Sequence, residues 1–139
     1  MKSAKLIIVL TVTTLISGLG LSLLNSWAQP QIEAYRQKVL EQAIYEVLPG
    51  IEKYKTKTIQ DTDFYEGLDS SGDKVNVAFK AIGNGFQSEI RVLVGMDTSL
   101  TKIIGVNLLQ QVETPGLGTK ISDDPTRDNP NWFMEQFEG

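Results

Sequence analysis

The most chemically distinctive segment of the chain runs from residue 111 to 120 and reads QVETPGLGTK. It follows an apolar run, and Glu113 and Thr114 supply a hydrogen-bond acceptor and a hydroxyl group where that run ends. Two glycines flank Leu117, and glycine lets the backbone approach a ligand closely. Exposed N–H groups in such a loop could meet the polar edge of a ring or a phosphate.

The same segment also fits a simpler interpretation, a tight loop in which Pro115 and the glycines only make the turn. A single Gly-x-Gly is weak evidence, and the segment is neither a dinucleotide fingerprint nor a P-loop. Composition alone leaves both interpretations open.

The absence of two residue types excludes several kinds of catalytic and metal site. The chain has 139 residues with no cysteine and no histidine, which excludes disulfides, thiolate nucleophiles, iron–sulfur ligation and Ser-His-Asp chemistry within it. Carboxylates alone could bind a hard cation, but their spacing defines no site. We therefore predict no catalytic residue and no metal ligand.

The net charge argues against nucleic acid as a partner. Thirteen basic residues stand against 17 acidic ones, a formal net charge of −4, whereas phosphate contact needs a basic patch. Lys53, Lys55 and Lys57 alternate with other residues, which predicts the solvent face of an extended segment.

The N-terminal region is predicted to be a membrane anchor. No charge lies between Lys5 and Glu33, and a helix over Leu6–Leu24 would be about 28 Å long, close to the ~30 Å hydrocarbon core of a bilayer. Lys2 and Lys5 keep the N-terminus cytoplasmic. We expect residues 1–28 to anchor the chain in a bacterial inner membrane by a single pass, with residues 29–139 on the extracytoplasmic side.

A cleaved signal peptide is the alternative for this leader. Ser26-Trp27-Ala28 is a small-x-small site behind a basic N-terminus, but the apolar run is longer than the usual ~7–15 residues. Both interpretations export the domain.

The elements that must position the loop follow from hydrophobic period. Pro30 is expected to begin a helix that ends at Pro49-Gly50. The period then changes to two, which predicts extended segments over 58–68, 75–79, 90–96 and 102–112 with short connections. These favour an antiparallel meander within an α+β fold. A short helix over 131–138 carries aromatic residues that need cover, so we expect the C-terminal part of the domain to be missing.

The run Glu-Thr-Pro-Gly-Leu-Gly at 113–118 resembles the signature of the FMN-binding domain family. That family includes the G subunit of the Rnf-type electron transport complex and the C subunit of the sodium-translocating NADH:quinone reductase. The other features that line up with it are the N-terminal span, Val47-Leu48-Pro49-Gly50, Gly83-Asn84-Gly85-Phe86, Asp97, Ile104-Gly105-Val106, Trp132, Phe133 and Phe137. The shorter domain and the helix end are most like the Rnf G subunit.

The resemblance implies FMN as the cofactor. It places Glu113, Thr114, Gly116, Leu117 and Gly118 beside the flavin, with Leu117 on the ring. Family members carry FMN covalently on the threonine of a Ser-Gly-Ala-Thr-type motif, which a flavin transferase loads. This chain contains no such motif, and for that reason too we expect it to be part of a longer protein.

The resemblance also implies a function and its partners. The chain would be a flavoprotein subunit passing electrons within an ion-translocating oxidoreductase complex in the membrane, beside the other subunits of that complex. The alternative is an anchored extracytoplasmic binding module, or a structural pilin-like one, without a cofactor.

Overall fold

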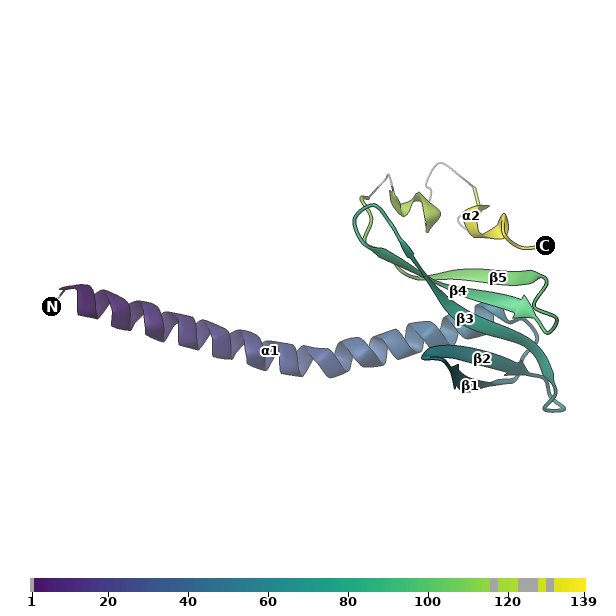
Figure 1. Ribbon diagram of the computed structural model, residues 1–139, viewed down its shortest axis with the longest axis horizontal. Helices are drawn as coiled ribbons and strands as arrows, with labels where there is room; N and C mark the ends of the chain where they lie inside the picture. The colour runs from purple at the N-terminus through teal and green to yellow at the C-terminus, as the bar shows by residue number, and fades with distance from the viewer. Residues whose placement is uncertain (1, 116–117, 123–127, 130–131) are drawn as a thin grey trace. The chain divides into compact units, whose positions relative to one another are not determined.

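The computed structural model describes residues 2–115, 118–122, 128–129 and 132–139. Its elements are α1 (Lys2–Val47), β1 (Lys53–Ile59), β2 (Thr62–Leu68), β3 (Lys74–Asn84), β4 (Glu89–Asp97), β5 (Ile103–Gln110), a 3-10 turn η1 (Gly118–Ile121) and α2 (Trp132–Glu135) (Figure 1). By compactness the chain divides into residues 1–38 and 39–139.

Helix α1 is continuous through Pro30, so the expectation that Pro30 begins a new helix is wrong. Proline lacks the N–H that would bond to the carbonyl of Ser26, so the helix continues past Pro30 without that hydrogen bond. Nearer the N-terminus, Thr11 and Thr14 donate their hydroxyls to the carbonyls of Ile7 and Leu10, both at 2.8 Å. The boundary after residue 28 stays a prediction.

The same helix is long and apolar enough to cross a membrane. Its candidate span covers Ser3–Val47, and its most apolar window has a mean hydropathy of 2.2 with none of it buried in the protein. An N-terminal signal sequence would have the same character. The helix therefore agrees with the predicted anchor.

The five strands form one antiparallel sheet in the order β1-β2-β3-β4-β5, which confirms the predicted meander and the α+β class. One extended segment over 58–68 is not what forms. The chain reverses at Gln60 and Asp61, whose φ angles are 48° and 61°, so β1 and β2 pair as a hairpin. The sequence hid this turn because neither residue is glycine, the usual signal for positive φ.

The core lies between the end of α1 and one face of the sheet. Its buried side chains are Ala43, Ile44, Val47, Leu48, Tyr65, Ala78 and Leu93. The helix backbone comes so close that a Cβ on Gly105 would lie 2.8 Å from the Cα of Val47, and one on Gly95 would overlap the Val47 carbonyl oxygen. Glycine at these two positions lets the helix rest on the sheet.

The opposite face of the sheet is apolar as well. Because neighbouring residues of a strand point to opposite faces, Val92 and Val94 lie away from the helix when Leu93 faces it. The rings of Phe64 and Phe79 lie 6.1 Å apart between β2 and β3. Alternation predicted the strands, but only the packing of Leu93 identifies the face that α1 covers.

The C-terminal aromatic residues pack on one another. The Phe133 ring lies 5.7 Å from the Trp132 ring and 5.5 Å from the Phe137 ring, both edge to face. The N–H of Gly139 donates to the carbonyl of Ile103 at 3.1 Å, which ties this segment to β5. The expected short helix is present as α2, with four residues.

Candidate functional site

The sheet topology brings the loop that starts at Glu113 next to the connection between β3 and β4. Strands β4 and β5 are antiparallel, and Arg91, near the start of β4, pairs with Gln110 at the end of β5. The residues just before β4 therefore lie beside the residues just after β5. Those residues are the turn Gly85–Ser88 and the segment that includes Glu113 and Thr114.

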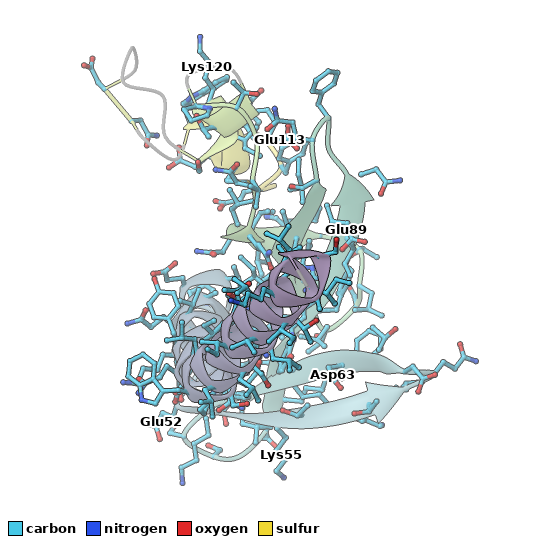
Figure 2. The ribbon with its side chains drawn as sticks, turned by 90° about the vertical axis from the view of Figure 1, so that its left-hand side faces the viewer. Glu52, Lys55, Asp63, Glu89, Glu113 and Lys120 are labelled. Atoms are coloured by element: carbon cyan, nitrogen blue, oxygen red, sulfur yellow. The ribbon has the colours of Figure 1, made fainter. Side chains whose placement is uncertain are left out.

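The carboxylate of Glu113, a residue labelled in Figure 2, joins the two segments. The side chain is buried, with 9% of the residue's surface exposed. The N–H of Gln87 donates to both carboxylate oxygens at 3.2 and 3.3 Å, and the N–H of Ser88 donates to Oε1 at 3.3 Å. The Glu113 N–H donates to Oε1 of Gln111 at 2.8 Å. This predicted site residue is thus held by the backbone of a turn 25 residues away.

Two glycines make room for this side chain. A Cβ on Gly85 would overlap Oε1 of Glu113, and a Cβ on Gly118 would lie 2.5 Å from the Cβ of Glu113. The turn closes through the N–H of Gly85, which donates to the carbonyl of Ser88 at 2.8 Å. We call the turn Gly85–Ser88, Glu113 and Gly118 together the turn–loop latch.

Backbone groups rather than a cation meet the carboxylate of the latch. Within the described part of the chain, the ion pairs are Lys74 with Glu66 and Arg91 with Glu89, and neither involves Glu113. Its charge is met by two successive N–H groups, the arrangement by which backbone nests bind anions. In Figure 2 Glu113 lies at the end of the domain away from the labelled Lys55 and Glu52. The predicted solvent-facing lysines are on β1, remote from this carboxylate.

A second carboxylate caps the turn between β4 and β5. Asp97 accepts the N–H groups of Thr101 and Lys102 at 2.9 and 3.1 Å and the hydroxyl of Ser99. The Ser99 hydroxyl and then the Lys102 N–H lower the pKa of Asp97 below its ordinary value. This exposed turn uses the same chemistry as the latch but lies at the other end of β4.

The remaining predicted site residues differ in what the structure describes. Thr114 is half-buried, and its carbonyl accepts the N–H of Gly118 at 3.0 Å and that of Thr119 at 3.4 Å. The Gly118 N–H is therefore engaged within the loop. Gly116 and Leu117 lie outside the described residues, so the predicted packing of Leu117 on a ring stays a prediction.

The sequence placed Gly83-Asn84-Gly85-Phe86 among the features of the resemblance but gave no sign that this segment meets Glu113. Gln87 and Ser88 act through backbone N–H groups, which leave no trace in residue type. Two exposed apolar residues lie within the latch or next to it along the chain. Phe86, within the turn, is 95% exposed, and Val112, before Glu113, is 61% exposed.

A cavity of about 240 Å³ lies elsewhere in the domain, among the end of α1, β5 and α2. Its lining includes Glu46, Glu135 and Glu138, and three carboxylates would repel a phosphate. The described residues that line it lie apart from the latch. This cavity is therefore a poor site for an anionic nucleotide.

Comparison with known proteins finds a family match for the region that contains the latch. Residues 85–137 match the model of the FMN-binding domain family. The resemblance seen in the sequence is confirmed. The match begins at Gly85 of the turn and includes Glu113 and Gly118, and it supports FMN as the predicted cofactor.

The relatives agree with that family, and each is the G subunit of an ion-translocating oxidoreductase complex. The protein from Methanosarcina acetivorans is 27% identical over 126 residues, covering 85% of this chain and 67% of the relative. The one from Shewanella piezotolerans is 27% identical over 115 residues, covering 72% and 53%. The one from Shewanella baltica is 38% identical over 71 residues, covering 50% and 31%. The matches thus span from about a third to two thirds of these relatives.

Proposed function

We propose that this chain is the FMN-binding part of a membrane-anchored subunit that passes electrons through covalently bound FMN within an ion-translocating oxidoreductase complex. The observation that carries the proposal is the family match over residues 85–137, together with the names of the relatives that cover most of the chain. The apolar helix supports the anchor.

The residues around the latch fit a flavin. An isoalloxazine ring is flat and apolar on its faces and polar along one edge, so it needs apolar cover and a few uncharged polar groups. Phe86 and Val112 offer exposed apolar surface beside the latch, and Thr114 offers a hydroxyl in the loop. Covering an almost fully exposed phenylalanine with an aromatic ring is favourable by burial and by ring stacking.

When bound, FMN would supply the redox chemistry, taking electrons from a reduced donor and passing them to an oxidised acceptor. The chain would position the cofactor and tune its surroundings. Among the described residues the buried carboxylate of Glu113 is met by backbone N–H groups and not by a cation.

The partners and location are part of the same proposal. The other membrane subunits of the complex would be the partners of this chain, and a flavin transferase would load the cofactor. The domain would lie on the extracytoplasmic side of a bacterial inner membrane, since Lys2 and Lys5 precede the apolar run of α1. The Ser-Gly-Ala-Thr-type motif whose threonine carries FMN in the family has no counterpart in residues 1–139.

The test is in-gel flavin fluorescence of the product of the intact gene, coexpressed with a flavin transferase and run on a denaturing gel. A fluorescent band at the mass of the subunit is expected, because a covalent bond survives denaturation. Expression without the transferase is the matched control and should give a dark band. A dark band in both, with the C-terminus verified by mass spectrometry, would favour an anchored binding or structural module.

A further inference from the structure

Glu113 is the first residue of the loop that carries the family signature, yet both of its carboxylate oxygens are already engaged by the turn Gly85–Ser88. A carboxylate that also contacted the flavin would have to offer an oxygen to it, but the residue is only 9% exposed. The side chain is therefore placed to hold protein to protein.

We propose that Glu113 is a positioning residue: its carboxylate fixes the turn Gly85–Ser88 against the loop after β5, so that both present one preformed surface to FMN. The inference rests on the proposed function and revises the expectation that Glu113 itself binds the cofactor. The turn and the loop would form this surface only when the latch holds them together.

Packing supports this role independently of the hydrogen bonds. Gly85 and Gly118 come from the two sides of the latch, and the Glu113 side chain occupies the space that a Cβ on either would need. The carboxylate is thus enclosed from both segments. Moving one segment away from the other would leave a negative charge and two backbone donors without their present partners, so the latch favours the closed arrangement.

The geometry also explains why the residue is an acid. A nest of two successive N–H groups favours an anion, and a glutamine in its place would turn its NH₂ group toward at least one donor or leave that group unpaired. An aspartate would keep the charge but is one methylene shorter, so it would not reach both Gln87 and Ser88. Only glutamate supplies the length and the charge together.

The test compares Glu113→Gln with the wild type, as the intact gene product coexpressed with a flavin transferase. Two quantities are measured on the native protein: quenching of the bound flavin's fluorescence by iodide, and hydrogen exchange of the Gln87 and Ser88 amides. We expect exchange at these two amides to rise about tenfold, the equivalent of ~1.4 kcal/mol, and iodide to quench the flavin more strongly. Glu113→Asp should change both quantities in the same direction and serves if the glutamine variant does not fold.

Asp97→Asn is the matched control. It removes a carboxylate that accepts two backbone N–H groups in a turn, as Glu113 does, but from a turn outside the latch. It should lower the melting temperature and leave iodide quenching of the flavin unchanged. A general loss of stability would instead increase quenching in both variants, which would overturn the proposal.

Two further outcomes would also overturn it. Faster exchange at Gln87 and Ser88 with unchanged flavin quenching would mean that the latch only stabilises the fold. Altered quenching with unchanged exchange would mean that Glu113 contacts the flavin directly. If the wild-type protein carries no flavin, the proposed function itself is overturned, because the latch then has no cofactor to position.

Discussion

The requirement for glycine at position 85 gives the sharpest test of the latch geometry. A Cβ on Gly85 would overlap Oε1 of Glu113 and lie 2.7 Å from the carbonyl oxygen of Ser88. Gly85 does not need positive φ, so alanine is not excluded by its own backbone. The effect of Gly85→Ala should therefore come from crowding, which typically costs about 1–3 kcal/mol, less the ~0.4–1 kcal/mol by which alanine restricts the unfolded chain.

Part of that crowding depends on Glu113. In a Glu113→Ala background the carboxylate is gone, and the Ser88 carbonyl is the remaining close neighbour of the new methyl group. The cost of Gly85→Ala should then fall, and we expect a coupling of about 1 kcal/mol between the two substitutions, within the range for residues in contact. Urea unfolding of the full chain in detergent, followed by tryptophan fluorescence, would measure the free energy of unfolding of the wild type, the two single variants and the double variant.

Additive effects would refute the reasoning. If the two single substitutions sum to the double within ~0.3–0.5 kcal/mol, the usual result for independent sites, Glu113 is not what makes glycine necessary at position 85. A Gly72→Ala cycle with Glu113→Ala is the control. Among the described residues nothing lies within 4 Å of the Cβ position of Gly72, whose φ is 85°, so its cost is backbone strain and should not couple to Glu113.

Three other predictions test the core, a turn and the exposed aromatic residue. Ile44→Ala, at a fully buried position, should lower the free energy of unfolding by about 2–5 kcal/mol, whereas Ile32→Ala, 44% exposed, should change it by under ~0.5 kcal/mol; urea unfolding measures both. The lowered pKa of Asp97 means that its contribution is present above the ordinary aspartate value of ~3.9 and lost as pH falls through the lowered one. The stability difference between wild type and Asp97→Asn should therefore shrink below about pH 4 in thermal unfolding, and a constant difference would contradict this cause. Phe86→Ala should increase iodide quenching of bound flavin without changing stability, and Ile82→Ala, 61% exposed, should do neither; equal quenching in all three proteins would remove Phe86 from the site.

Local signals in the sequence determined much of the fold. Period-two alternation predicted strands within β3, β4 and β5, and short connections between them predicted the antiparallel order, because such connections leave little choice of neighbour. The composition of residues 6–24 was enough to predict a long apolar helix, and the run at 113–118 was enough to predict the family. Each of these inferences depends only on the types of residues that are close together in the sequence.

Two features of the fold, the helix through Pro30 and the hairpin at Gln60 and Asp61, were not predicted correctly from such local signals. Pro30 was expected to begin a helix because proline favours the first helical position. The helical turns on both sides of Pro30 outweigh that preference, and α1 continues through it. The hairpin at Gln60 and Asp61 was missed because positive φ there is imposed by the pairing of β1 with β2 rather than by glycine. In both cases the surrounding structure outweighs the preference of a single residue.

The candidate site divides in the same way. Residue type alone identified Glu113, Thr114 and the glycines of the loop as candidate site residues. Only the pairing of β4 with β5 decided that Glu113 would meet Gln87 and Ser88. Those two residues act through backbone N–H groups, which every residue but proline possesses, so no sequence pattern can distinguish them. The sequence therefore determined which residues could form a site, and the tertiary structure decided which of them bind the rest of the protein.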